Sequence, residues 1–333
     1  MITWGIVANS HDASIAVFET KQRGLGPPEG TARLRWAGLA KDFSKIPNDP
    51  HLNKKLIRRA MRLGKPNKVI WYERPFLKTL RQFYAGQGWL GKENNIHRYL
   101  SEYGINCPIE YTQHHLSHAA YAYYTQPHDD CAVVCLDSIG EFETLTVWHG
   151  KNNKLKKLYS QGYPHSLGLF YSAMTQRIGL IPNRDEYLVT EWAAKGNGIY
   201  LMHDMLQELV KVNQDSNKPS VRMRENLHRG CRWWKPELTS KQDMYDIAAA
   251  TQAVFEYCVK LLSNYAHYKT NHGSAIAFAG GGALNKKAMD QVRKDWDSVW
   301  VPPNPGDPGS CIGAVLAQTK TKITLDKQWY KAI

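Results

Sequence analysis

Two histidines spaced four residues apart, His114 and His118, are the residues whose spacing most directly suggests chemistry in this chain. On a helix this spacing places both imidazoles on one face, about 6 Å apart, where they can share one divalent metal ion. A zinc protease with this motif needs a glutamate directly after the first histidine as its general base. His115 occupies that position here, which disfavours protease chemistry.

Two distant aspartates supply carboxylates at positions where sites are usually built. Asp137 ends the apolar run 131–136, and Asp307 lies in the turn-rich run 302–310. Strand ends and loops carry functional side chains because a rigid scaffold positions them. The alternative interpretation is that some of these histidines and aspartates form only local hydrogen bonds.

Three consecutive glycines, Gly280 to Gly282, lie between an expected strand at 275–279 and an expected helix at 283–294. Glycines let backbone N–H groups approach an anion, and a helix N-terminus adds positive potential. A tight turn needs only one glycine, so the run favours an anionic ligand.

The net charge of +13, from 43 Lys and Arg against 30 Asp and Glu, favours a polyanionic partner, most simply nucleic acid. The alternative is a basic surface that only aids solubility. The cations are concentrated in two segments. The expected helix at 50–63 carries a basic face, and segment 222–235 mixes cations with indoles, which suits phosphate tracking and base stacking. The candidate nucleic-acid-binding residues are Lys54, Lys55, Arg58, Arg59, Arg62, Arg229, Arg232, Trp233, Trp234 and Lys235. A place in the core is the alternative for the tryptophan pair.

Length and composition indicate a soluble globular chain that can form two lobes, because it has 333 residues and 43% hydrophobic content. No apolar run approaches the ~20 residues of a membrane span, and the N-terminus lacks a signal sequence. Six scattered cysteines without a CxxC pair predict buried thiols in the reducing cytoplasm. No membrane partner is expected.

Several motifs in a fixed order resemble one family over residues 1 to 318. They occupy residues 2–14, 114–118, 136–144, 166–172, 185–187, 279–285 and 306–314. Together they resemble the O-carbamoyltransferases of the nodulation-factor and antibiotic type. The transfer domain of this family is similar to the tRNA threonylcarbamoyltransferases, and both belong to the actin-like ATPase superfamily.

The resemblance implies roles for particular residues. The metal ligands are expected to be His114, His118, Asp137 and Asp307, with iron preferred and manganese or zinc as alternatives. Phosphate or nucleotide contacts are expected from Gly140, Glu141, Gly280, Gly281, Gly282 and Asn285. His11 is expected near the reacting hydroxyl.

Two departures from the family concern the donor. The family continues its Glu-Tyr motif with a Lys-Val-Met-Gly-Leu-Ala-like run, whereas this chain has Glu191 in place of the glycine. A carboxylate near an expected phosphate site leaves a role for ATP open. The larger enzymes also carry a C-terminal domain that activates carbamoyl phosphate as an adenylate, and we expect that domain to be absent. Carbamoyl phosphate itself is therefore the expected donor.

The order of elements predicts an α/β protein with the duplicated two-lobe fold of actin-like ATPases. Three strands followed by helix and strand alternation are expected twice. The expected strands are 3–8, 14–19, 33–39, 68–72, 108–111, 131–137, 143–149, 154–160, 275–279 and 298–301. Helices are expected near 50–63, 92–103, 114–125, 166–178, 283–294 and 309–318. The predicted lobes are residues 1–127 and 128–333, with a helical, basic insertion near 197–245 over the cleft.

The expected reaction needs an electrophile and a base. A metal ion can polarise the carbamoyl oxygen and neutralise the leaving phosphate. A histidine suits the role of general base toward a hydroxyl. His11, oriented by Asp12, is the first candidate, although a simple loop histidine is the alternative. His115 is the second candidate, but on a helix it points about 100° away from His114.

The predicted function is carbamoylation of a hydroxyl, with 5-hydroxymethylcytosine in DNA as the favoured acceptor. Such hypermodification suits a virus-encoded enzyme acting in the cytoplasm of a bacterial host. Alternatives are O-carbamoylation of a small sugar or antibiotic, tRNA threonylcarbamoyl transfer, and a non-catalytic nucleotide- or nucleic-acid-binding paralogue. An intact set of metal ligands disfavours the last.

Overall fold

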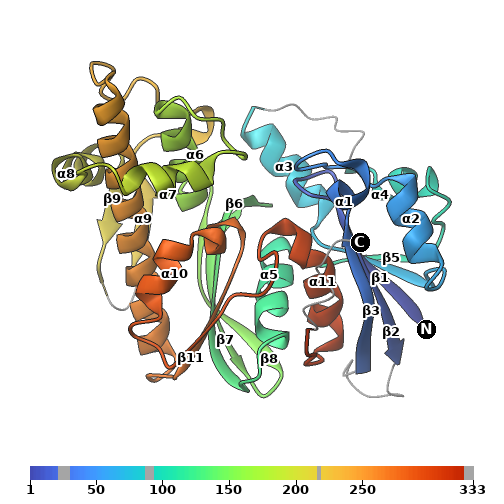
Figure 1. Cartoon of the computed structure of the whole chain (residues 1–333). Coiled ribbons are helices and arrows are strands. Elements are labelled where there is room, and N and C mark those ends of the chain that lie inside the picture. Colours follow the sequence, from blue (N-terminus) through green and yellow to red (C-terminus); the bar gives the residue numbers. More distant parts are fainter. Residues whose placement is uncertain (22–30, 87–93, 216–218, 326–333) are drawn as a thin grey trace.

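The chain folds into two five-stranded sheets with helices between and around them, as seen in a computed structural model that describes residues 1–21, 31–86, 94–215 and 219–325 (Figure 1). This arrangement confirms the predicted α/β class. The first sheet has the order β3-β2-β1-β4-β5. Its strands are β1 (Ile2–Val7), β2 (Ser14–Lys21), β3 (Thr31–Leu39), β4 (Lys68–Trp71) and β5 (Ile109–Tyr111).

The second sheet repeats the plan of the first. Its order is β12-β11-β6-β7-β8, from β6 (Asp130–Gly140), β7 (Glu143–Lys151), β8 (Lys154–Gly162), β11 (Ala275–Ala279) and β12 (Ser298–Trp300). In each sheet the first three strands pair antiparallel, and the last two add in parallel beside the first. The same strand order and directions therefore occur twice in the chain.

Two helices fill the space between the sheets, α5 (His114–Tyr124) and α11 (Ser310–Thr319) (Figure 1). Successive residues of β6 point to opposite faces, as the period of a strand requires. Val133 and Cys135 join the core that contains α5, α11 and the first sheet, whereas Val134 and Leu136 join the core on the other face. The N-termini of α5 and α11 are thereby held close to the end of β6.

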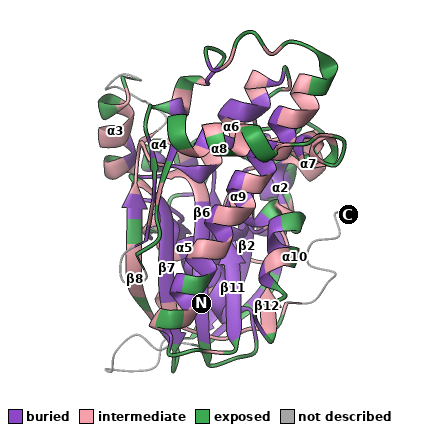
Figure 2. Cartoon of the chain, turned by 90° about the vertical axis from the view of Figure 1, so that its left-hand side faces the viewer, coloured by how far each residue is buried: buried purple, intermediate pink, exposed green. Residues whose placement is uncertain are grey.

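The remaining helices cover the outer faces and the upper end of the molecule. In the first half they are α1 (Ala40–Ser44), α2 (Lys54–Met61), α3 (Pro75–Tyr84) and α4 (Ile96–Ser101). In the second half they are α6 (Leu167–Arg177), α7 (Glu186–Ala193), α8 (Ile199–Glu208), α9 (Lys241–Lys269) and α10 (Lys286–Val292). Figure 2 shows the buried strands of the second sheet lying behind α9, which begins at a capping box formed by Ser240 and Asp243.

Each strand expected from the sequence is present, with ends shifted by a few residues. Two predictions needed correction. The helix expected at 283–294 is a 3₁₀ turn, η3 (Gly281–Leu284), followed by α10, because Asn285 caps a new helix. The insertion at 197–245 is helical only in part, since α8 is followed by a two-stranded sheet, β9 (Val210–Asn213) and β10 (Ser220–Met223), and by the 3₁₀ turn η2 (Leu227–Arg229).

The helices α1, α3, α7 and α9 were not predicted. The segment between β2 and β3, residues 22–30, lies outside the described residues. Among the described residues, no helix combines the length and the apolar character that a bilayer crossing requires.

Candidate metal centre

Four predicted ligands, from three separate parts of the chain, meet in one place. His114 and His118 lie on the first turns of α5, Asp137 lies in β6, and Asp307 opens the 3₁₀ turn η4 (Asp307–Gly309) before α11. One ligand atom from each residue lies within 4.8 Å of all the others. The two Nε2 atoms are 3.1 Å apart, and the His114 Nε2 lies 3.2 Å from Asp137 Oδ2. Both Nε2 atoms lie 3.4 Å from Asp307 Oδ1.

The other ring nitrogens of the two histidines face oxygen atoms, as metal-bound histidines usually do. His118 Nδ1 lies 3.2 Å from the Ser310 hydroxyl. His114 Nδ1 lies 3.7 Å from the carboxylate of Glu73, a buried residue that Lys78 holds at 2.7 Å. A proton on each Nδ1 would leave both Nε2 atoms free to act as ligands. The donor set of two imidazoles and two carboxylates therefore fits a divalent metal ion.

Electrostatics at this centre favour a cation. Burial alone would lower the pKa of His114, but Asp307, Asp137 and Glu73 outweigh burial and hold that pKa well above its usual value. For Asp137 burial acts in the opposite direction and would raise the pKa. The hydrogen bond to His114 and the neighbouring imidazoles outweigh burial and lower the pKa of Asp137 strongly. Carboxylates gathered in a buried place create negative potential that either protons or a metal ion can neutralise.

Sequence reasoning missed several residues around this centre. The hydroxyl of Ser10 donates to Asp307 Oδ2 at 2.7 Å, and Ser310 contacts His118 as described above. Glu73 faces His114 from the end of β4, and a carboxylate directly after a buried strand was the signal that could have found it. Ser10 and Ser310 gave no such signal, because isolated serines in loops are common.

Gly140 and Glu141 have roles other than the predicted phosphate contact. A Cβ on Gly140 would lie 2.1 Å from Cδ2 of His114, so the glycine makes room for the imidazole. The carboxylate of Glu141 is buried, and it accepts hydrogen bonds from the backbone N–H of Arg74 at 2.7 Å and from its guanidinium at 3.0 Å. A buried carboxylate in this pairing would repel a phosphate. The phosphate contact of Glu141 stays a prediction, and the half-exposed Arg74 that it holds is better suited to an anion.

The three glycines pack against the end of β6. Gly280 has a positive φ of 85°, and a Cβ there would lie 2.1 Å from the carbonyl oxygen of Leu136. A Cβ on Gly282 would lie 2.7 Å from the Cβ of Leu136, so close packing explains these two glycines. The N–H of Gly281 is exposed and lies 3.5 Å from Oδ1 of Asp137. Of the run, Gly281 adjoins the metal centre most directly.

Asn285 was expected to face a nucleotide or phosphate, and its side chain has protein partners in the structure. Its side-chain oxygen caps α10 by accepting from the N–H of Ala288 at 3.1 Å. Its amide also forms a reciprocal pair with the amide of Gln252. These contacts occupy both polar ends of the side chain, so the role seen here is structural.

The two candidate bases have very different surroundings. His11 is exposed in the loop after β1, between Asn9 and Asp12, which both have positive φ. Such backbone strain in non-glycine residues is concentrated at functional sites. Asp12 contacts Lys41 at 3.2 Å, so an ion pair replaces the expected orienting contact with His11.

His115 is poorly placed to act as the base. It is fully buried, and its ring nitrogens contact the Thr146 hydroxyl at 3.0 Å and the Glu143 carbonyl oxygen at 3.1 Å. Burial also lowers its pKa well below the usual value. This histidine packs α5 onto β7, and its catalytic role stays the less favoured prediction.

The candidate nucleic-acid-binding residues divide into exposed and occupied ones. Lys54, Lys55 and Arg58 are exposed on α2, Arg62 is exposed at its C-terminal end, and Arg59 is half-buried. In the second segment Arg229, Arg232 and Trp233 are exposed, Trp233 by 55%. Trp234 is buried, with its indole N–H donating to Glu208 at 2.7 Å, so it cannot stack on a base. Lys235 is paired with Asp204 at 2.7 Å and is not free for a phosphate.

The chain belongs to the family described as "Carbamoyltransferase N-terminus", whose profile matches residues 75–316. Its curated relatives include uncharacterized protein sll1178 of Synechocystis sp., 29% identical over 75% of this chain and 46% of the relative. They also include uncharacterized proteins MJ1058 and MJ1051 of Methanocaldococcus jannaschii, both 24% identical. MJ1058 matches over 78% of this chain and 46% of its own length, and MJ1051 over 82% and 54%. The chain spans about half the length of these curated relatives.

Replacing Gly140 with alanine is expected to weaken metal binding and lower the thermal stability, because the new Cβ would overlap the His114 ring. Overpacking of a buried site typically costs about 1–3 kcal/mol. Gly281→Ala is the matched control, since its Cβ would lie 3.6 Å from the nearest atom, Asp137 Oδ1. Thermal unfolding and metal titration of both variants test this. Equal behaviour of the two would contradict the packing argument.

Proposed function

We propose that this protein is a metal-dependent O-carbamoyltransferase with an actin-like fold, and that it modifies a hydroxymethyl group on a base in DNA. The four-ligand centre of His114, His118, Asp137 and Asp307 is the observation that carries the proposed chemistry. Membership of a carbamoyltransferase family supports it. Support for the actin-like assignment comes from the duplicated five-stranded sheets with equal strand order.

A divalent metal bound at the centre would act as a Lewis acid toward the carbamoyl oxygen and the leaving phosphate. Iron is our first choice, with manganese or zinc as alternatives. Ser10 and Glu73 position two of the ligands, Asp307 and His114. Arg74, held by Glu141, directly follows Glu73 in the chain and would offer a positive charge to the donor phosphate. His11, in the loop that also carries Ser10, would accept the proton of the acceptor hydroxyl.

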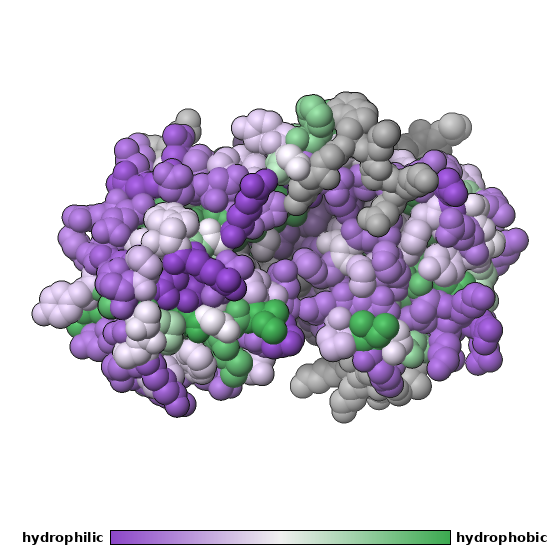
Figure 3. Space-filling view, turned by 90° about the horizontal axis from the view of Figure 1, so that it is seen from above, coloured by the Kyte–Doolittle hydropathy of each residue, from purple (hydrophilic) through white to green (hydrophobic). Residues whose placement is uncertain are grey.

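The proposed acceptor is 5-hydroxymethylcytosine in DNA. A net charge of +13 and the exposed cations of α2 and of segment 222–235 support a polyanion. Figure 3 shows a hollow between the two halves of the molecule, with hydrophilic residues on much of its rim. A base inside a duplex cannot reach a buried centre easily, so the enzyme is expected to flip the base or to prefer single strands. The exposed Trp233 could then stack on a base.

A small sugar or antibiotic is the second candidate acceptor. The polar hollow would also accommodate such a molecule, but a small neutral or cationic acceptor gives no reason for the basic surface. We propose carbamoyl phosphate as donor without a need for ATP, since Glu191 would repel a nucleotide phosphate at the segment where the family has glycine.

A product assay with a panel of acceptors tests this function. The protein, loaded with iron, manganese or zinc, is incubated with carbamoyl phosphate and either hydroxymethylated DNA, plain DNA, tRNA or an aminoglycoside, with and without ATP. Nucleoside mass spectrometry should detect a carbamoylated product only from hydroxymethylated DNA, and without ATP. Turnover of the aminoglycoside alone would move the assignment to the small-molecule class. Strict ATP dependence with release of AMP would overturn the proposed donor.

A further inference from the structure

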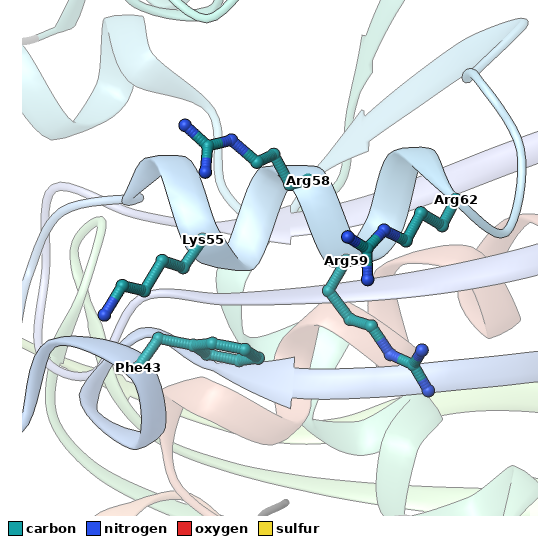
Figure 4. A pocket seen from close by; sticks show the side chains of 5 residues that line it. All are labelled: Phe43, Lys55, Arg58, Arg59 and Arg62. Carbon is teal, nitrogen blue, oxygen red and sulfur yellow. The ribbon is translucent and has the colours of Figure 1, made fainter.

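A basic pocket lies beside α1 and α2, separate from the metal centre (Figure 4). It has a volume of about 430 Å³ and is lined by one aromatic ring and four cations, Phe43, Lys55, Arg58, Arg59 and Arg62. The volume falls within the range of about 300–1,000 Å³ that is typical of small-ligand sites. The sequence placed the four cations on one face of a helix, but gave no indication that Phe43 lies beside them at a pocket that is largely open to solvent.

The charge of this pocket is not neutralised by the described parts of the protein. Within residues 1–21, 31–86, 94–215 and 219–325, none of the four cations has a carboxylate within salt-bridge distance. The Nε of Arg59 is buried and has no hydrogen-bond partner in that part of the chain. Buried donors are normally satisfied, and like charges around one cavity repel each other, so both observations point to an anionic ligand.

The aromatic ring narrows the class of ligand. Phe43 is half-buried, and its ring lies alongside α2 between Lys55 and Arg59 (Figure 4). A ring next to guanidinium groups fits a nucleotide, because the ring can stack on a base while the cations hold its phosphates. A free inorganic anion would make no use of an aromatic wall.

The position of the pocket relates it to the metal centre. Lys41, on the same helix as Phe43, contacts Asp12, and Ser10 in that loop donates to the metal-centre residue Asp307. None of the pocket residues is a metal ligand. A phosphate in the pocket therefore lies outside the reacting centre, on elements that are linked to it through α1 and the loop after β1.

We propose that the Phe43 pocket is a nucleotide subsite, which holds a phosphate and the adjoining base of the acceptor strand outside the reacting centre. This inference rests on the proposed nucleic-acid acceptor, and it adds the place where the strand is gripped. It also assigns to the Phe43 ring a stacking contact with a base, whereas binding by charge alone would need only the four cations.

Anisotropy titration of a fluorescent, hydroxymethylated single-stranded oligonucleotide at two salt concentrations tests the subsite. The variants are Arg58→Gln with Arg62→Gln, and Phe43→Leu alone. Lys65→Gln with Lys156→Gln is the control, since it removes two exposed positive charges from outside the pocket. The arginine variant should bind more weakly. The slope of the logarithm of the binding constant against the logarithm of the salt concentration should fall in magnitude by about 0.7 for each phosphate that is no longer neutralised. Phe43→Leu should weaken binding about 5- to 100-fold, as removal of one stacking partner does, with the slope kept.

If both pocket variants bind the oligonucleotide as tightly as the control does, the proposed subsite is wrong. Competition with inorganic phosphate separates the two sources of the anion. If the pocket variants bind the oligonucleotide like the wild type, and differ from it only in that inorganic phosphate no longer competes, the nucleic-acid assignment is wrong. If pocket-dependent binding is found while no carbamoylated nucleoside forms, the subsite stands and the proposed reaction fails. Circular dichroism of each variant shows whether it is folded.

Discussion

Replacing His118 with alanine is expected to remove the bound metal and abolish carbamoyl transfer. His118 contributes an Nε2 atom that lies within 3.4 Å of both His114 and Asp307, and its side chain is fully buried. Without it the centre keeps one imidazole and two carboxylates, which bind a divalent ion more weakly. Elemental analysis of the purified variant, together with the product assay, measures both effects.

His115→Gln is the matched control for this variant, because it alters another buried histidine of the same helix. His115 faces Thr146 and Glu143 on β7 and not the metal centre. The control should lose thermal stability but keep its metal. Full metal occupancy in His118→Ala, or equal metal loss in a folded His115→Gln, would refute the ligand assignment.

Replacing His11 with alanine is expected to lower the turnover about 100- to 10,000-fold, which is the usual effect of removing a general base. His11 is exposed in the loop whose Ser10 contacts Asp307, so the imidazole can approach an acceptor bound at the centre. Metal content and oligonucleotide binding should stay at the wild-type level, since His11 is neither one of the four clustered ligands nor part of the basic pocket.

His51→Ala is the control for His11→Ala, because His51 is also exposed and lies on a loop at the same end of the first sheet. It should keep wild-type turnover. Single-turnover rates measured by rapid quench distinguish the two variants. Wild-type turnover in His11→Ala would transfer the proton-acceptor role to another group at the centre.

The order of strands was predictable because apolar runs and turn residues carry local information. Three consecutive strands followed by alternating helices and strands were expected twice along the chain, and this pattern indicated two sheets. The helix with His114 and His118 was predictable for the same reason. The four ligands came from a resemblance of motifs, and the structure places them within 4.8 Å of one another.

The errors concern side chains whose role depends on tertiary contacts. Trp233 and Trp234 are equivalent in the sequence, but Trp234 is buried and its indole N–H donates to Glu208. Gly140 was taken for a phosphate contact because a glycine that makes room for a side chain has the same sequence pattern as one that approaches an anion. Glu73 follows a buried strand, which is a sequence signal, but its contact with His114 forms only in the folded chain.

Transfer of an isotope-labelled carbamoyl group to DNA is the most direct test that this centre carries out the proposed reaction. Wild-type protein and His118→Ala are incubated with ¹³C-carbamoyl phosphate and a hydroxymethylated oligonucleotide, and the digested nucleosides are analysed by mass spectrometry. We expect the label on the hydroxymethyl oxygen of cytosine with the wild type, and none with the variant. Unlabelled nucleosides with the metal-loaded wild type, or equal labelling by the variant, would contradict carbamoyl transfer at this centre.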